Sequence, residues 1–232
     1  MRIFAIDTAL EACSAAVLDT ERGDGVHGEI VARESMPMAR GHAEALMPLI
    51  ARVLAQAGTD FAHIDRIAVT TGPGSFTGMR VGIAAARGLA LAAGKPAVGL
   101  STLSAYAAPY IDADPTLPVV AAIDARHDHV YLQVFGTGGR TLVSPRVVTI
   151  AEALRLSAGG TPRLVGTAAE LLAAAWPADG RAPVGVERRA APDIDWVALL
   201  GARAEIGQSP PKPLYLRPPD AQPQNAAHLA RR

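Results

Sequence analysis

The sequence predicts an α/β protein made of two copies of one domain. The tripeptide Ala122-Ile123-Asp124 repeats Ala5-Ile6-Asp7 at an offset of 117 residues (124 − 7 = 117), close to half of the 232-residue chain, and Val134 falls on Val17 at the same offset. The expected order of strands and helices also begins again after this offset. A short identity that coincides with a repeated element order indicates an internal duplication.

The first copy opens with an antiparallel meander. Strands are expected over 2–6, 12–18 and 28–36, with a turn at 21–25 between the last two. A helix is expected over 42–57, because apolar residues recur there at helical spacing up to the stop signal Gly58. Pro48 should kink or shift this helix, since its nitrogen cannot donate a hydrogen bond to Glu44.

The stretch 70–94 is the centre of the first copy. A short buried strand at 67–69 leads into a sharp turn, Gly72-Pro73-Gly74-Ser75, and then into a helix. Ser75 is the expected N-cap and Gly94 the expected C-terminal stop. A strand at 97–100 completes the order β, β, β, α, β, α, β.

This central helix is apolar on almost every side apart from Arg80 and Arg87. Gly78 and Gly82 lie one turn apart, and an interior helix glycine costs about 1 kcal/mol relative to alanine, so something should pack against them. A single sheet would not cover a helix that is apolar all round. We therefore hypothesise that the helix contacts its own sheet on one side and the helices of a partner protein on the other.

The second copy repeats the pattern. Its strands are expected over 119–124, 130–135, 141–147 and 163–165, with a turn at 136–139. Two capping boxes, Thr149-x-x-Glu152 and Thr167-x-x-Glu170, predict the starts of two helices. The domain boundaries expected from these elements are 1–103 for the first lobe and 104–217 for the second.

The end of the chain has three expected parts. Residues 178–192 are expected to be a loop, and 194–206 an amphipathic helix that could return to the first domain. The segment 218–232 is rich in Pro, Ala and Gln and is expected to be a disordered tail.

Composition limits the possible functions. The chain has 22 basic and 22 acidic residues, and its basic clusters do not exceed Arg188-Arg189 and Arg231-Arg232, so it should not hold RNA alone. The single cysteine, Cys13, excludes an intrachain disulfide and a multi-thiolate zinc site and suits a reducing cytosol. We expect no signal peptide, because Asp7 interrupts the N-terminus, and no membrane span, so a cytoplasmic location is predicted.

The glycine-rich turn could serve two purposes. Gly72, Gly74 and Gly78 ahead of a helix could cradle a phosphate, but the spacing does not match a dinucleotide fingerprint or a P-loop. A tight turn with close helix packing explains the glycines without a ligand. Ser75 lacks the flanking glycines of a nucleophile elbow and is read as a cap, and Cys13 as a buried structural thiol.

Carboxylates and histidines offer two further candidates. Asp7 and Asp124 each end a first strand, where a metal-bridging carboxylate could lie, but one carboxylate per copy favours a turn-capping role. His127 and His129 share a face if extended and could suggest a metal, yet an exposed polar turn is the favoured interpretation because no third ligand is evident. His42, near a helix start, fits a surface position.

The motifs resemble the TsaB (YeaZ) family from end to end. The matching stretches are 3–9 through Cys13-Ser14, the run Gly72-Pro73-Gly74-Ser75-Phe76-Thr77-Gly78 with Arg80, Gly82 and Gly88, 100–103, 121–126 with Val130-Tyr131, and Pro213-x-Tyr215-Leu216-Arg217. The resemblance implies two RNase H-like lobes of the actin/Hsp70-type superfamily, each with a mixed five-stranded sheet flanked by helices.

The resemblance also implies a function without catalysis. Members help to make N6-threonylcarbamoyladenosine at position 37 of tRNAs that read codons starting with A, as partners of the catalytic subunit TsaD and the ATPase TsaE. A homodimer in isolation is possible, tRNA is expected only within the complex, and no cofactor is expected. The metal-binding histidines of the catalytic relative correspond to Thr102 and Tyr106, neither of which is a usual ligand.

The family's partner surface maps onto the helices 42–57 and 75–93. The residues expected in this interface are Leu46, Ile50, Arg80, Ile83, Arg87 and Leu91. The turn made by Asp7, Gly72, Gly74 and Ser75 would be the remnant of a nucleotide site. The alternatives are an ATP-dependent small-molecule kinase of the same superfamily, a metallopeptidase and a plain structural homodimer.

Overall fold

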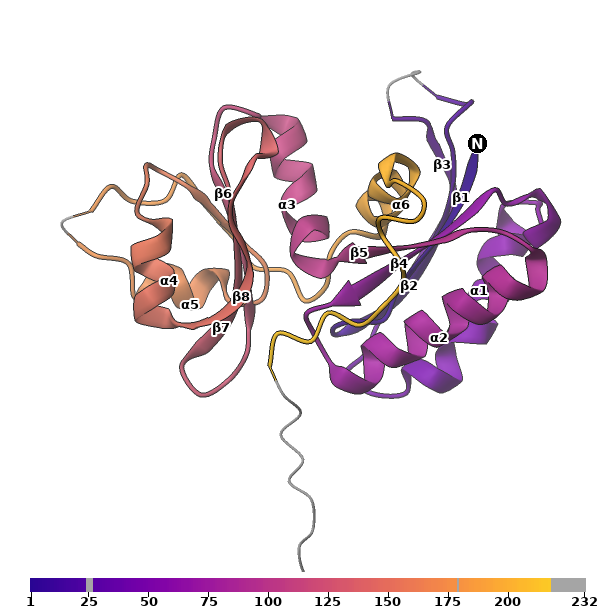
Figure 1. Ribbon diagram of the computed structural model, residues 1–232, viewed down its shortest axis with the longest axis horizontal. Helices are drawn as coiled ribbons and strands as arrows, with labels where there is room; N and C mark the ends of the chain where they lie inside the picture. Colours follow the sequence, from indigo (N-terminus) through magenta and orange to yellow (C-terminus); the bar gives the residue numbers. More distant parts are fainter. Residues whose placement is uncertain (24–26, 179, 218–232) are drawn as a thin grey trace, which may run out of the picture.

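The computed structural model describes residues 1–23, 27–178 and 180–217 as two lobes that share one sheet topology (Figure 1). The strands of the first sheet lie in the order β3-β2-β1-β4-β5, and those of the second in the order β10-β9-β6-β7-β8. In each sheet three antiparallel strands precede two strands parallel to the first strand of that lobe. This equivalence confirms the fold class and the duplication predicted from the offset.

The first lobe contains the expected strands and helices. Its strands are β1 (Arg2–Asp7), β2 (Ala12–Asp19), β3 (Glu29–Pro37), β4 (Arg66–Gly72) and β5 (Ala97–Ser101). Helices α1 (His42–Gln56) and α2 (Phe76–Ala93) cover one face of this sheet, and a 3-10 turn spans Phe61–His63. Helix α1 includes Pro48. The Ser75 hydroxyl accepts a hydrogen bond from the Gly78 amide, and Gly94 ends α2 in the left-handed region, so both predicted caps are confirmed.

The second lobe has shorter helices than the first. Its strands are β6 (Val119–Asp124), β7 (His129–Phe135), β8 (Thr141–Thr149), β9 (Arg163–Val165) and β10 (Gly185–Glu187), with helices α4 (Ile150–Ser157) and α5 (Ala169–Ala174) and a 3-10 turn at Thr137–Gly139. Thr149 caps α4 as predicted. The prediction of a second capping box at Thr167-x-x-Glu170 is wrong. The Thr167 hydroxyl accepts a hydrogen bond from the Asp124 amide at 2.9 Å, and α5 has no side-chain cap.

Two further elements differ from the sequence prediction. The expected loop 178–192 contains β10, a three-residue strand too short to show a pattern. The stretch Thr102–Ala113 forms α3, for which no helix was predicted. The turn at 21–25 lies only partly, and the tail from 218 not at all, within the described residues.

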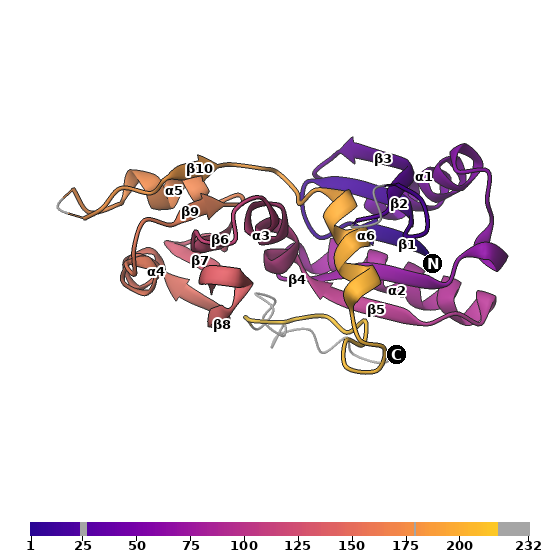
Figure 2. The ribbon, with the colours of Figure 1, turned by 90° about the horizontal axis from the view of Figure 1, so that it is seen from above.

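The lobes exchange their third helices. Helix α3 follows β5 of the first lobe but packs against the second sheet, through Leu103, Tyr106 and Ala107. Helix α6 (Ile194–Arg203) follows β10 of the second lobe but packs against the first sheet (Figure 2). Each sheet is therefore covered on both faces, and one of the two faces is covered by a helix from the far half of the chain.

Candidate protein-interaction surface

The carboxylate of Asp7 is enclosed at the end of β1. Its side chain is 0% exposed, and Oδ1 accepts hydrogen bonds from the Thr70 hydroxyl and, at 3.1 Å, from the Ala9 amide. Burial raises the pKa of Asp7, while the bonds from Thr70 and Ala9 and the nearby His42 act in the opposite direction. The bond to Ala9 is the local turn that a capping Asp makes.

The glycine-rich turn is pressed against the β1–β2 turn. The Ser75 amide donates to the Ala9 carbonyl at 2.7 Å, and a Cβ on Gly74 would lie 2.2 Å from that oxygen. A Cβ on Gly78 would lie 2.2 Å from the Thr8 carbonyl oxygen. Close backbone approach therefore explains these glycines without a phosphate, and the Ser75 amide is engaged within the fold.

The two positions that the family resemblance aligns with metal-binding histidines lie in the first two turns of α3. Thr102 is 0% and Tyr106 2% exposed, and the Tyr106 hydroxyl donates to the Arg189 carbonyl at 2.9 Å. Burial raises the pKa of Tyr106. These side chains pack the junction between the lobes, and the described residues contain no group of three His, Cys, Asp or Glu placed to hold a metal ion.

The remaining candidate residues, three histidines and the cysteine, have surroundings that explain them by local structure. His127 lies in a turn in which Arg126, His127 and Asp128 all have positive φ, and the His129 Nδ1 donates to the His127 carbonyl at 2.5 Å. His42 is 7% exposed and donates from Nε2 to the Leu10 carbonyl, so its expected surface position is wrong. Cys13 is buried, as expected, and burial raises the pKa of its thiol to about 11.

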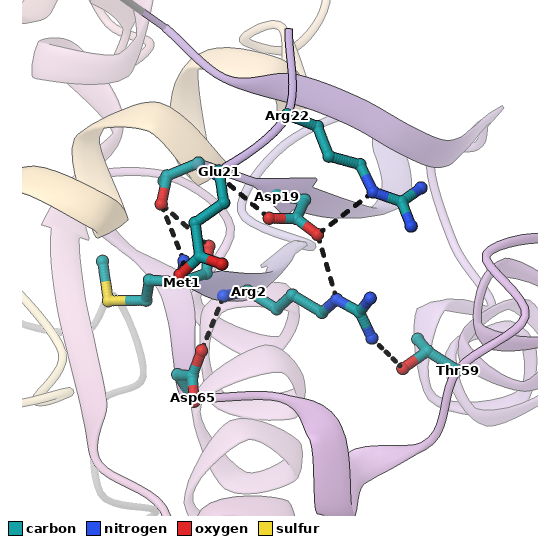
Figure 3. A network of polar contacts seen from close by, with 8 residues as sticks. Met1, Arg2, Asp19, Glu21, Arg22, Thr59 and Asp65 are labelled. Atoms are coloured by element: carbon teal, nitrogen blue, oxygen red, sulfur yellow. Dashed lines mark hydrogen bonds and ion pairs between the residues drawn. The ribbon is translucent and has the colours of Figure 1, made fainter. Parts of the chain in front are cut away.

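A surface hollow of about 450 Å³ lies at the opposite end of the first sheet, where β1 begins. Arg2 donates from Nε to the Asp19 carboxylate at 3.1 Å, Arg22 lies 3.5 Å from the same oxygen, and the Arg2 amide donates to Asp65 (Figure 3). Burial would raise the pKa of Asp19, but the Glu21 amide and Arg2 outweigh it and lower the pKa. These charges are paired with one another and tie the start of β1 to its neighbours.

Helices α1 and α2 lie side by side on the outside of the first lobe (Figure 1). Three residues of the expected interface are buried in the lobe's own core: Leu46 is 1%, Ile50 2% and Ile83 4% exposed. They face the sheet, so the prediction that they offer contact surface is wrong. Helical periodicity could not choose between the faces, because both are apolar.

The outer face of α2 carries a different set of residues. The exposed residues at helical spacing are Arg80, Ala84, Arg87, Gly88 and Leu91, hereafter the α2 stripe. Leu91 is 86% exposed, and on the neighbouring helix Met47 is 52% exposed. A Cβ on Gly88 would meet no atom within 4 Å. Small residues also recur at i, i+4 on the buried face, at Gly78, Gly82, Ala86 and Ala90, so this spacing alone does not separate the two faces.

The α2 stripe has unpaired positive charge. No carboxylate of the described residues lies within ion-pair distance of Arg80 or Arg87. Guanidinium groups beside small and apolar side chains can receive a helix that carries carboxylates. No helix in the described part of the chain is long and apolar enough to cross a lipid bilayer.

Fold and surface together define a two-lobed α/β protein with duplicated mixed sheets and an exposed helix pair on its first lobe. The family model described as "TsaD: tRNA N6-adenosine threonylcarbamoyltransferase" matches residues 19–179. YeaZ from Pseudomonas aeruginosa superposes with a TM-score of 0.75 at 29% identity, covering 93% of this chain and 99% of that one.

Named sequence relatives cover a smaller part. The Escherichia coli protein described as "tRNA threonylcarbamoyladenosine biosynthesis protein TsaB" is 42% identical over 134 residues, 56% of this chain and 53% of that one. The Haemophilus influenzae protein of the same description is 40% identical over 131 residues, 56% and 52% of the two chains. The chain spans about half the length of these relatives in the alignments. It belongs to the TsaD family and, within it, to the TsaB (YeaZ) proteins.

Proposed function

We propose that this chain is a non-catalytic subunit that binds and activates a TsaD-like catalytic subunit, which installs the threonylcarbamoyl group on N6 of adenosine 37 in tRNAs that read ANN codons. The names of the relatives from E. coli and H. influenzae support the pathway. A TsaE-like ATPase would join the complex in the cytoplasm, and tRNA would be bound only by the assembly. The chain could form a homodimer when the catalytic subunit is absent.

The proposal rests on the open space around Gly88 in α2. Gly82, like Gly78, is explained within the fold, because a Cβ there would lie 2.4 Å from the Thr8 hydroxyl oxygen. Gly88 has open space around it, yet an interior glycine weakens a helix by about 1 kcal/mol relative to alanine. A second helix that closes on Gly88 would give this residue the packing role that Thr8 gives to Gly82.

The rest of the outer face suits a helix pair from another chain. Leu91 and Met47 supply apolar area, while Arg80 and Arg87 supply donors at the edge. A standard interface buries about 800 Å² on each partner, which two helices of 15 and 18 residues can provide.

The non-catalytic role is supported by the surroundings of the catalytic positions. Thr102 and Tyr106 are buried, and Tyr106 is hydrogen-bonded to the Arg189 carbonyl. Asp7 is enclosed and bonded to Thr70. Activity would then depend on the catalytic subunit. Calorimetry of the isolated chain with ATP and Mg²⁺ checks the kinase alternative, for which we expect little or no heat of binding.

Two substitutions of Gly88 test the proposal, one through the stability of the free chain and the other through its affinity for the catalytic subunit. Gly88→Ala should raise the melting temperature of the free chain, because it adds helix propensity without a clash. Gly88→Gln should leave the free chain folded but weaken binding to the catalytic subunit by about tenfold or more, because the side chain fills the space of the partner helix. Leu142→Ala is the control, because Leu142 is also exposed but lies on β8 of the second lobe, and it should leave binding unchanged.

Reconstitution completes the test. tRNA modification by the catalytic subunit and the ATPase should require this chain and should fall with Gly88→Gln in proportion to binding. Unchanged affinity of the Gly88→Gln variant would show that the outer face of α2 is not the contact. Full modification in the absence of this chain would refute the activating role.

A further inference from the structure

Two exposed aromatic side chains meet at the N-terminal end of α2. Phe76 is 39% and Tyr215 45% exposed, and their ring centroids lie 5.4 Å apart with an angle of 31° between the planes. The Arg80 guanidinium lies 3.7 Å from the centroid of the Phe76 ring, and its Nε donates to the Tyr215 hydroxyl at 2.8 Å. We call these three residues the aromatic–arginine cluster. It joins α2 to a segment more than a hundred positions away in the sequence.

The segment that carries Tyr215 is held in place by its backbone. After α6, residues 204–217 run past β5 and β4 toward the start of α2 (Figure 1). The Gly99 amide donates to the Ser209 carbonyl at 2.8 Å, and the Leu214 amide donates to the Thr71 carbonyl at 2.8 Å. A Cβ on Gly99 would lie 2.8 Å from the Pro210 carbonyl oxygen. Tyr215 is therefore presented by a fixed segment, which reduces the entropy cost of its use in binding.

We propose that the aromatic–arginine cluster extends the α2 stripe as one docking surface, in which Tyr215 is an aromatic anchor and Arg80 receives an acidic side chain of the catalytic subunit. This inference rests on the proposed function and adds the C-terminal segment to the contact. It assigns to Tyr215 a role in binding the partner in addition to its contacts within the chain.

Continuity with the α2 stripe supports this assignment. Arg80 belongs to both, since it lies one turn before Ala84 on the exposed face and also contacts Tyr215. Tyrosine, tryptophan and arginine are the residue types that most often dominate binding energy at protein interfaces. An exposed aromatic pair adjoining an arginine, next to an open helix face, matches that composition.

Charge indicates the chemistry of the partner. A guanidinium has five N–H donors, and the structure shows one of those of Arg80 bonded to Tyr215. Among the residues described, none contributes a carboxylate to Arg80. A carboxylate of the partner could bind the free edge of the guanidinium while Phe76 and Tyr215 hold the group in place.

A nucleobase is a less suitable occupant than a protein side chain. Stacking requires an open ring face, and Arg80 covers one face of Phe76 while Tyr215 packs beside it. The chain also has a formal net charge of +0, whereas single-stranded nucleic acids are held in positively charged grooves. A protein partner with acidic groups therefore fits this cluster best.

The experiment compares substitutions at Tyr215 in the full chain. Titration calorimetry with the purified catalytic subunit should give affinities about tenfold weaker for Tyr215→Ala and about threefold weaker for Tyr215→Phe, which keeps the ring but loses the hydroxyl. Ile206→Ala, at a residue 59% exposed on the same segment, should stay within about twofold of wild type. Arg80→Ala should also reduce the salt dependence of binding. Unchanged melting temperatures show that the variants are folded.

Each contrary outcome has a clear meaning. Wild-type affinity of Tyr215→Ala, with normal binding by the wild-type chain, would overturn this inference and leave the proposed function standing. Loss of self-association or of tRNA binding, without loss of binding to the catalytic subunit, would overturn it in favour of a second copy or of RNA. A folded wild-type chain that does not bind the catalytic subunit would overturn the proposed function and this inference together.

Discussion

The two lobes have the same sheet order but very different helices on the outer face. In the first lobe α1 and α2 have 15 and 18 residues, whereas in the second lobe α4 and α5 have 8 and 6. Both sheets have five strands, but β9 and β10 have 3 residues each where β4 and β5 have 7 and 5, so the second sheet needs less helix to cover it. The additional helix length of the first lobe creates outward surface, and this is the surface that we assign to the catalytic subunit.

The first hairpin of each lobe shows a similar contrast. Asp7 accepts from the amide two residues later, and Asp124 accepts from the Arg126 amide at 2.8 Å. Asp7 is buried and bonded to Thr70, and the glycine-rich turn packs against the residues that follow it, Thr8 and Ala9, while Asp124 is exposed. Both copies therefore have the same local turn, and the solvent exposure of the carboxylate depends on the segments packed around it.

The largest expected effect separates the two faces of α2. Ile83→Asp should destabilise the first lobe by about 3–5 kcal/mol, because it puts an uncompensated charge in the core. Leu91→Asp, on the 86% exposed side, should cost only about 1 kcal/mol, from the lower helix propensity of Asp and its negative charge in the last turn of α2. Urea denaturation of both variants measures the difference. Equal stability of the two would mean that the inner face of α2 is wrongly assigned.

The next effect concerns the attachment of α6 to the first lobe. Arg66 Nη1 donates to the carbonyls of Gly201, Ala202 and Ala204 at 2.7, 3.1 and 2.8 Å, and so binds the C-terminal end of the helix. Arg66→Met should lower the free energy of unfolding by about 2–3 kcal/mol. The same substitution at exposed Arg87 is the control, and calorimetric unfolding compares them. A loss no greater than that of Arg87→Met would contradict the capping role.

A smaller effect depends on pH and concerns the buried carboxyl group of Asp7. The raised pKa of Asp7 means that the folded state binds this proton more tightly than the unfolded state, so Asp7 should lower stability as pH rises from about 4 through its folded pKa. Stability of Asp7→Asn relative to wild type should therefore increase over that range, by at most about 1.4 kcal/mol per pH unit. Parallel profiles for wild type and Asp7→Asn would disprove the effect.

The smallest effect is expected at α3. Tyr106→Phe keeps the ring but loses the hydrogen bond to the Arg189 carbonyl, and should cost about 1 kcal/mol. Tyr110→Phe, on the same helix, removes a hydroxyl with no described hydrogen bond and serves as the control. Guanidinium denaturation monitors both. If the two substitutions had equal effects, the Tyr106 bond would not stabilise the junction.

The sequence predicted what local signals determine. The duplication, the order of elements along the chain, the caps at Ser75 and Gly94 and the positions of α1 and α2 all follow from periodicity and turn residues. Helix α3 was missed because an alanine-rich apolar run has no polar face to mark it, and β10 because three residues show no alternation.

The candidate site was harder to predict for a physical reason. A helix that is apolar on both sides does not reveal from its own sequence which side meets its sheet, so Ile83 and Leu91 looked equivalent. The open space at Gly88 and the contact of Tyr215 with Arg80 depend on tertiary packing, which brings together residues distant in sequence.

The exchange of α3 and α6 also bears on when the protein can finish folding during translation. The second face of the first sheet cannot be covered until residues near 200 have been synthesised, because α6 packs there on β1 and β2, which are made at the very beginning. Contacts of such long sequence separation form slowly, and uncovered apolar sheet surface invites aggregation in nascent chains. A ribosome that stalled midway would hold a half-covered sheet, so this topology should make the nascent chain depend on chaperones until α6 has emerged.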